Sequence, residues 1–174
     1  MKIISRFNQK GYTLIELLLY VVIIGMILVP LTLFFGMSSE ARVKAQSISE
    51  VEDQGTAAMD YITQTIRNSY SITTPAAAAS GASLTLVVPT TALSPTVFSL
   101  SGTALQVKEG ASGSNVALTS GDVQMSNLTF KNLTRSGTSG IVQVSFTLTR
   151  TNNSGGRNEF DYSKTFTSSA EIGW

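Results

Sequence analysis

Two hydrophobic patterns follow one another along the N-terminal part of the chain. From Tyr12 to Met37 the residues are apolar on every side, and Glu16 is the one charged side chain among them. From Ser38 onward, small or apolar residues recur every three or four positions, with charged and polar residues between them. The stripe consists of Ala41, Ala45, Ile48, Val51, Gly55, Met59, Ile62, Ile66 and Tyr70. Together the two patterns predict one long helix from residue 12 to about residue 72.

The first half of this helix, residues 12–37, is long enough to cross a membrane. A helical residue rises about 1.5 Å, and the hydrocarbon core of a bilayer is roughly 30 Å thick. The positive-inside rule then predicts a cytoplasmic N-terminus and translocation of the chain after about residue 38, because three basic residues precede the run: Lys2, Arg6 and Lys10. Residues 38–74 are predicted to be the amphipathic half of the same helix. A separate stalk helix or coiled coil is the alternative, but the stripe spans too few heptads to favour a coiled coil.

After residue 74 the period of the pattern changes to two. Residues 75–83 (PAAAASGAS) are predicted to be a low-complexity linker, and residues 84–174 an antiparallel β domain. Residues 123–130 predict a strand with a break in its register, because two alternating pairs there are out of phase. The alternating apolar positions are Leu84, Leu86 and Val88; Leu105 and Val107; Val123 and Met125, then Leu128 and Phe130; Val142, Val144, Phe146 and Leu148; and Phe160, Tyr162 and Phe166.

Clusters of Gly, Ser, Asn and Thr separate these runs at residues 110–114, 134–140 and 151–156. Residues 97–105 (VFSLSGTAL) are predicted to form a strand-turn-strand unit. The fold class is therefore α+β, with one long N-terminal helix packed on an antiparallel sheet of about five to seven short strands.

The start of the chain differs from an ordinary secretory signal, in which a small-residue cleavage site follows a short apolar core. Here a polar, basic leader of residues 1–10 comes first, then Gly11, and the apolar run follows. The segment Lys-Gly-Tyr-Thr-Leu-Ile-Glu-Leu at residues 10–17 resembles the type III signal of type IV prepilins. That family shows a basic leader, a Gly, an aromatic residue, a short apolar stretch and a Glu at the fifth place after the Gly. Tyr12 stands where Phe is commoner.

The resemblance implies that a prepilin peptidase on the cytoplasmic membrane face removes residues 1–11 by cutting between Gly11 and Tyr12. The same enzyme usually N-methylates the new terminus, here at Tyr12. Loss of the leader would turn a signal into a lasting membrane anchor. The resemblance also implies the pilin fold and assembly with other pilin or pseudopilin subunits through the N-terminal helix.

Glu16 has two interpretations. A carboxylate near the centre of a membrane helix costs roughly 2.5–3.5 kcal/mol on insertion scales, and less near the interface. The simple interpretation is that Glu16 lies at the level of the lipid headgroups. The functional one, which the family supports, is that Glu16 pairs with the α-amino group of Tyr12 on a neighbouring subunit and offsets the burial of both charges.

Pro30 lies inside the apolar run and is a candidate helix bend. A proline in a helix interior removes one backbone hydrogen bond and tends to kink the helix. A tolerated membrane proline is an equal alternative.

Composition narrows the function classes. The chain has 174 residues, 13% of them charged, a net charge of +1, and neither cysteine nor histidine. Nothing in this charge balance predicts nucleic-acid binding. No disulfide, thiolate nucleophile or histidine base is available, so we expect no enzyme, cofactor or metal.

Asp122 is better explained as a turn residue than as a calcium ligand, because no acidic neighbours complete the ligand set. Three Asn-x-Ser/Thr triplets, at Asn127, Asn132 and Asn152, are better explained by turn chemistry than by glycosylation.

The C-terminal half is similar in pattern to minor pilins and J-type minor pseudopilins, with a Leu-Thr-Ser-x-x-Val element at residues 118–123. The absence of a cysteine pair differs from many major pilins. The resemblance therefore implies a minor, tip or initiation subunit of a type IV pilus, a type II secretion pseudopilus or a DNA-uptake machine.

The expected partners of such a subunit are other subunits, the prepilin peptidase, an inner-membrane assembly platform and membrane lipid. It would start in the inner membrane and end in an extracytoplasmic filament or at the cell surface. The alternative is a single-span anchor that displays an adhesive β domain and never polymerises. The Gly11 and Glu16 pattern discriminates between the two hypotheses, because a plain anchor needs neither residue.

Overall fold

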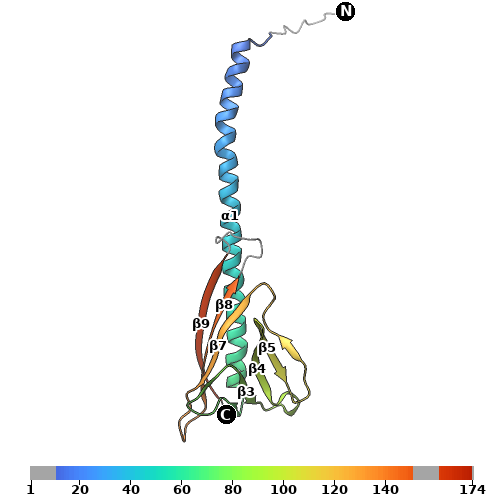
Figure 1. Ribbon diagram of the computed structural model, residues 1–174, viewed down its shortest axis with the longest axis vertical. Helices are drawn as coiled ribbons and strands as arrows, with labels where there is room; N and C mark the ends of the chain where they lie inside the picture. Colours follow the sequence, from blue (N-terminus) through green and yellow to red (C-terminus); the bar gives the residue numbers. More distant parts are fainter. Residues whose placement is uncertain (1–10, 151–160, 174) are drawn as a thin grey trace, which may run out of the picture. The chain divides into compact units, whose positions relative to one another are not determined.

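The computed structural model describes residues 11–150 and 161–173 and consists of one helix and two antiparallel sheets (Figure 1). The predicted leader residues 1–10, the polar cluster at 151–156 and Phe160 lie outside the described residues. The chain divides into two compact units, Met1–Arg42 and Val43–Trp174. The helix α1 (Leu14–Arg67) continues from the first unit into the second.

In the part of α1 that belongs to the first unit, every large apolar side chain is exposed. Its large apolar side chains range from Ile23, at 45% exposed, to Leu14, at 80%. Within the described residues, α1 is the one helix long and apolar enough to cross a membrane. The segment therefore has the length and composition of a membrane span, as its uniform apolar pattern predicts.

The part of α1 in the second unit buries one stripe of its surface. Val51, Gly55, Met59, Ile62 and Ile66 are buried, as predicted, and so is Ala58. The predicted stripe was too long at both ends, however. Ala41 and Ala45 are exposed, and Tyr70 lies beyond the helix and is 53% exposed.

The helix ends at Arg67 rather than near residue 72, so the predicted helical segment 38–74 is too long. Two backbone contacts explain the early end. The N–H of Ser69 donates to the carbonyl of Ile66 at 3.1 Å, and the N–H of Tyr70 donates to the carbonyl of Val87 at 2.7 Å. The chain thus leaves the helix to pair with a strand, which the three-four spacing of Ile66 and Tyr70 could not reveal.

Among the described residues, nine strands follow the helix and form two sheets. The first sheet has the order β1-β3-β4-β5-β6 and the second the order β2-β7-β8-β9, with all pairs antiparallel. A 3-10 helix, η1 (Thr91–Leu93), lies between β3 and β4. The strands are β1 (Ser71–Thr74), β2 (Ser80–Gly81), β3 (Leu84–Val87), β4 (Thr96–Ser101), β5 (Ala104–Glu109), β6 (Asn115–Ala117), β7 (Gln124–Asn132), β8 (Ile141–Arg150) and β9 (Tyr162–Glu171).

The α+β arrangement of a long helix on antiparallel strands is confirmed, and its layout matches the pilin fold. The number of sheets is a correction, because the strands divide between two sheets instead of forming one. The division begins in the segment predicted to be a linker. Ser80 and Gly81 pair with β7, whereas Leu84 and its neighbours pair with β4. Alternation along a strand shows which side chains are buried but does not show which strand is its neighbour.

The core fills the space between the helix stripe and the inward faces of both sheets. Phe98, Phe130 and Phe146 are fully buried in it. The predicted alternating positions on β3, β5, β7 and β8 are buried, except that Val88 is half-buried. The register break on β7 is confirmed too. The pairing of β7 with β8 shifts between Ser126 and Thr129, so Met125, Leu128 and Phe130 all point inward.

Candidate functional site

The predicted processing site lies directly before α1. Gly11, Tyr12 and Thr13 belong to no helix or strand, and all three are exposed. A β-carbon placed on Gly11 would meet no atom within 4 Å. Tyr12 is 77% exposed, and its ring lies edge-on to that of Tyr20 with centroids 6.4 Å apart. The bond between Gly11 and Tyr12 thus lies in an open, non-helical segment, which is the form of backbone that a peptidase can bind.

Thr13 sets the start of the helix. Its carbonyl accepts hydrogen bonds from the N–H groups of Glu16, at 3.1 Å, and Leu17, at 3.2 Å. Its hydroxyl oxygen also accepts a bond from the N–H of Glu16 at 3.4 Å. A threonine followed three positions later by a glutamate is the spacing of a capping box. Thr13 therefore acts as the N-cap, and Glu16 lies in the first turn.

Glu16 is half-exposed on a helix whose neighbouring side chains are all exposed. Within residues 11–150 and 161–173 its carboxylate has no hydrogen-bonding or ionic partner, although its backbone N–H is bonded to Thr13. The N-terminal end of a helix favours a negative charge. A carboxylate in this position can accept a hydrogen bond, or form an ion pair with a cation. The partner would approach along the helix axis from the side of residue 12.

Pro30 lies within α1 without ending it, since helical structure continues from Leu14 to Arg67. Close to it, the hydroxyl of Thr32 donates to the carbonyl of Val29 at 2.8 Å. The bend predicted at Pro30 stays a prediction. Gly25 and Gly36, on the same half of the helix, have open space where a β-carbon would lie.

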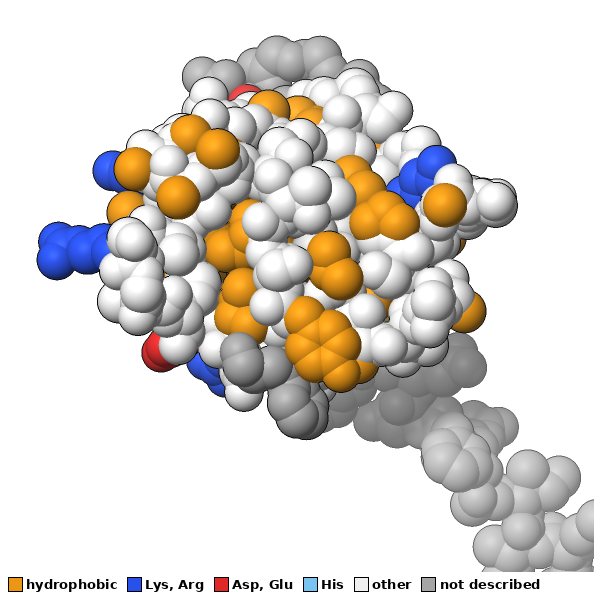
Figure 2. All heavy atoms as spheres, turned by 90° about the horizontal axis from the view of Figure 1, so that it is seen from below, with side chains coloured by type: hydrophobic (Ala, Val, Ile, Leu, Met, Phe, Trp, Pro, Cys, Tyr) orange, Lys and Arg blue, Asp and Glu red, His pale blue; other side chains and the backbone are white. Residues whose placement is uncertain are grey.

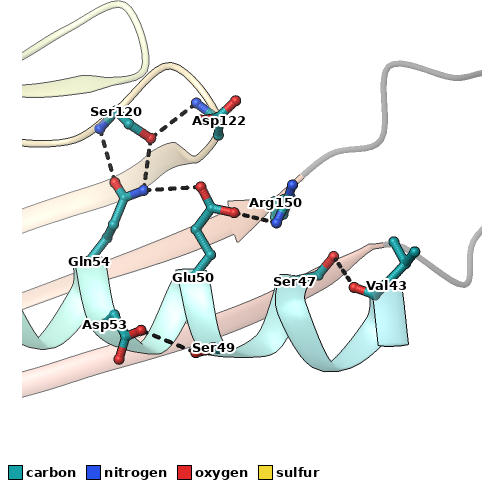
Figure 3. A network of polar contacts seen from close by, with 9 residues as sticks. All are labelled: Val43, Ser47, Ser49, Glu50, Asp53, Gln54, Ser120, Asp122 and Arg150. Carbon is teal, nitrogen blue, oxygen red and sulfur yellow. Dashed lines mark hydrogen bonds and ion pairs between the residues drawn. The ribbon is translucent and has the colours of Figure 1, made fainter. Parts of the chain in front are cut away.

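A polar clasp joins the second half of α1 to the loop before β7 and the end of β8 (Figure 3). Gln54 makes two bonds with Ser120: its Oε1 accepts from the Ser120 N–H at 2.9 Å, and its Nε2 donates to the Ser120 hydroxyl at 2.7 Å. The Gln54 amide also donates to Glu50 at 3.5 Å, and Glu50 forms an ion pair with Arg150. Both charged side chains of that pair are about three-quarters buried. The clasp fixes the helix relative to two segments far away in the sequence.

A second ion pair lies beside the clasp, between α1 and β9. The ammonium group of Lys164 donates to the carboxylate of Glu52 at 2.8 Å, and the Tyr162 hydroxyl donates to it at 3.4 Å. The hydrogen bond from Lys164, and then the lysine's charge, hold the pKa of Glu52 below its usual value. The same hydrogen bond raises the pKa of Lys164. Both shifts favour the charged forms, so the pair is a surface contact that strengthens the junction of helix and sheet.

The helix and β9 also meet at Gly55. A β-carbon there would lie 2.1 Å from the ring of Phe166, which stacks on Phe146 with centroids 5.4 Å apart. Lys164 lies over the Phe166 ring at 5.3 Å. The absence of a side chain at Gly55 lets the ring fill this space.

The weaker sequence signals have structural explanations. The Asp122 N–H donates to the Ser120 hydroxyl at 3.2 Å, as in a turn. Asn127 has a φ of 55° beside the shift in register on β7, a backbone region in which asparagine is enriched. Asn132 is 3% exposed, and its amide both donates to the carbonyl of Pro75 at 2.8 Å and accepts from the N–H of Thr134 at 3.0 Å. Asn152 lies outside the described residues. Turn and bulge chemistry thus accounts for the triplets at Asn127 and Asn132.

Figure 2 shows one end of the β domain from below. Hydrophobic side chains lie across the middle of this face in small groups, separated by uncharged polar and backbone atoms, and Lys and Arg side chains project at its rim. Scattered apolar surface of this kind is normal on a folded domain.

Sequence reasoning missed three parts of this arrangement. The N-cap Thr13 could have been found from its spacing to Glu16. The role of Gly55 had a weaker signal, because a glycine in a buried stripe indicates close approach of another element. The clasp has no local signal, since Gln54 and Ser120 are 66 positions apart in the sequence and Glu50 and Arg150 are 100 apart.

Comparison with known protein families places the N-terminal features together. Residues 6–32 match the family described as the prokaryotic N-terminal methylation motif. No curated protein and no solved structure is significantly similar to the chain. The match covers the predicted cleavage site, Glu16, Pro30 and the apolar run as far as residue 32. The motif and the exposed apolar helix fit anchoring in the inner membrane, and they support a precursor of type IV pilin or pseudopilin type. A motif of this type implies, in general, processing by a prepilin peptidase and assembly with other pilins.

Proposed function

We propose that the chain is a minor subunit, placed at the tip or at the initiation of a type IV pilus or a type II secretion-type pseudopilus. One observation supports assignment to a filament of this kind: the methylation motif at residues 6–32 is continuous with a helix whose apolar side chains are exposed on all sides. Such a helix needs lipid or other helices around it. In a filament it would leave the membrane and pack among the same helices of neighbouring subunits.

Processing is the first step. The prepilin peptidase would cut between Gly11 and Tyr12 and methylate the amino group of Tyr12. The open backbone of residues 11–13 supports this, because the helix begins after the bond to be cut. Mass spectrometry of the membrane-extracted protein tests the step. We expect a mature terminus at Tyr12 that carries a methyl group. A retained leader would instead favour the plain adhesive anchor.

Glu16 is proposed to guide assembly. Its carboxylate has no polar partner among the described residues, and the methylated amino group of Tyr12 on a neighbouring subunit would supply one. Two opposite charges that meet in a low-dielectric layer offset the burial of each other. A subunit that arrives with the wrong vertical position would leave both charges unpaired, so the pair would also set the register of assembly.

Replacement of the carboxylate separates assembly from membrane insertion. Glu16→Leu should be inserted and cleaved normally but should be absent from sheared filaments. Leu18→Ala is the matched control, because Leu18 is also exposed on the first turns of the helix and carries no charge. Incorporation of Glu16→Leu at the control level would overturn the assembly role of Glu16.

The minor-subunit role rests on the β domain and on the absence of cysteine from the sequence. Quantitative mass spectrometry of sheared filaments would measure the number of copies relative to the most abundant subunit. We expect few copies per filament, together with loss of filaments when the gene is deleted. A copy number equal to that of the main subunit would show a major pilin instead.

A further inference from the structure

The two sheets have four edges, and one of them differs from the other three. The edge strands β1, β2 and β6 have 4, 2 and 3 residues. The fourth edge strand, β9, has 10 residues and pairs with β8 over its whole length without a shift in register. It contains neither proline nor glycine. In Figure 1, β9 lies at the outer edge of its sheet.

A long, regular edge strand exposes backbone groups that bind another strand. In an antiparallel pair every second residue turns its N–H and C=O away from its neighbour. Proteins usually protect such an edge by keeping it short, or with proline, charge or a bulge. Within residues 11–150 and 161–173 no strand pairs with the outer side of β9. Three edges are therefore protected by their shortness. The charges of β9 are Lys164, which is paired with Glu52, and Glu171 at the end of the strand, so the stretch between them has the form of a strand that receives a partner.

We propose that the free edge of β9 pairs antiparallel with β9 of a second copy of this chain. Four outward side chains of β9 are arranged symmetrically about Phe166: Ser163, Thr165, Thr167 and Ser169, and all four are exposed. The outward side chain at the end of the strand, Glu171, lies outside this symmetric set. A two-fold contact requires a self-complementary surface of this kind. With the two strands centred on Phe166, Thr165 faces Thr167 of the second copy, and Ser163 faces its Ser169.

The chemistry of these pairs is already present on the other side of β9. Hydroxyl groups of β8 and β9 are hydrogen-bonded across the strands in three successive pairs. They are Ser145 with Thr167 at 3.1 Å, Thr147 with Thr165 at 2.9 Å, and Thr149 with Ser163 at 3.0 Å. Thr–Thr and Thr–Ser pairs stabilise antiparallel strands. A second β9 would continue the same rows of hydroxyl groups into the neighbouring sheet.

The inward side chains are compatible with the same register. Phe166 would meet Phe166 of the second copy, which gives an aromatic cross-strand pair. Lys164, which is held by Glu52, would face Ser168 and not a second lysine. One contact opposes the pairing, because Asp161 would come near Glu171 of the second copy and both are acidic.

The direction of β9 determines how the β domains of two paired copies are oriented. Its start lies beside Glu52, through Lys164, and just after its end the N–H of Gly173 donates to the carbonyl of Arg67 at 2.9 Å. Strand and helix therefore run in the same direction within the second unit. Antiparallel pairing therefore sets the second-unit helices of the two copies in opposite directions.

The absence of cysteine from the chain allows a direct test of this register. Two full-length variants with different tags, Thr165→Cys and Thr167→Cys, are purified in detergent, mixed and oxidised. In detergent the copies are free to take either direction. We expect a disulfide-linked dimer that contains both tags and is absent when either variant is oxidised alone, because Thr165 faces Thr167 and not itself.

The matched control is a mixture of Thr129→Cys and Thr147→Cys, which lie on the outward face of the same sheet but away from its edge. A dimer with both tags in the control to the same extent, or none in the test mixture, would overturn the proposal. In the same test background, Glu171→Lys should increase the yield of the dimer, because it replaces the opposed acidic contact with an attractive one. The assay needs no filament, so its failure leaves the proposed function untouched, and loss of filament assembly leaves the dimer intact.

Discussion

The two halves of α1 have the same secondary structure and opposite surroundings. In residues 14–37 every large apolar side chain is exposed, with Ile23 the least so at 45%. In residues 51–66 the apolar side chains of one stripe are almost completely buried, as Ile62 and Ile66 are at 0%. The first half has the composition of a core without the sheets that would cover it. The second half has fewer apolar residues and a complete core.

This difference shows where each half obtains its stability. The second half is held by packing on the sheets and by its polar contacts to β8, β9 and the loop before β7. The first half has no such packing within the described residues, so lipid or neighbouring subunits must supply it. A change in one half should therefore affect the folding of the β domain, and the matched change in the other half should affect insertion or assembly.

The largest expected effect comes from shortening a buried side chain of the stripe. Ile62→Ala should lower the free energy of unfolding of the β domain by about 2–5 kcal/mol, because it leaves a cavity in the core. Hydrogen exchange at the backbone amides of β7 and β8, in detergent-solubilised full chain, measures this free energy. Ile23→Ala is the matched control and should change it by less than about 0.5 kcal/mol. Equal losses in the free energy of unfolding from both substitutions would contradict the proposed difference between the two halves of α1.

The second effect concerns two glycines on the same helix. Alanine is the better helix former by about 1 kcal/mol at an open position, as at Gly25. At Gly55, however, the added methyl group meets the Phe166 ring, and overpacking of this kind costs about 1–3 kcal/mol. Gly55→Ala should therefore destabilise the β domain, whereas Gly25→Ala should leave its hydrogen exchange unchanged. The Phe166 ring is only half-buried, so we expect it to move away from the helix in Gly55→Ala. The NMR chemical shifts of the ring protons would report this movement.

The contrast between the two halves was predictable from sequence, because it depends on local periodicity. All-round apolar residues predicted the exposed half, and the three-four spacing predicted Val51, Met59, Ile62 and Ile66. Alternating apolar residues predicted the strand β7, and the change of phase between its two pairs of apolar residues predicted the register break. These patterns are properties of neighbouring positions, and secondary structure converts them directly into faces.

Non-local pairing was not predictable in the same way. Nothing in residues 75–83 shows that Ser80 joins β7 while Leu84 joins β4, and this step divides the strands between two sheets. The helix was predicted to be too long because Tyr70 continues its spacing, although the backbone of Tyr70 is already bonded to Val87. At the candidate site the motif predicted Gly11, Tyr12 and Glu16, but the N-cap Thr13 became apparent from its bonds.

The clasp provides a third, smaller test. Gln54→Ala removes both bonds to Ser120 and the contact with Glu50, and hydrogen bonds of this type contribute about 0.5–1.5 kcal/mol each. We expect a loss of about 1–2 kcal/mol in the stability of the β domain. Gln64→Ala, on the exposed side of the same helix, is the control and should have almost no effect. A result in which the two variants behave alike would show that the clasp forms without holding the helix.

The smallest effect should depend on pH. The pKa of Glu52 is lower in the folded chain than in the unfolded one, so its pair with Lys164 stabilises the fold above the ordinary glutamate pKa of about 4.3. The contribution is lost as the pH falls through the lowered pKa of Glu52, because the carboxylate must then be protonated. It is also lost at high pH, as the pH rises through the raised pKa of Lys164.

The free energies of unfolding of the wild type and of Glu52→Gln should therefore differ near pH 7 and converge below about pH 4. The side chains of Lys164 and Glu52 are 41% and 44% exposed, so added salt should reduce the difference at pH 7. A difference that persisted at low pH would assign the effect of Glu52 to packing of its side chain on β9 rather than to its charge.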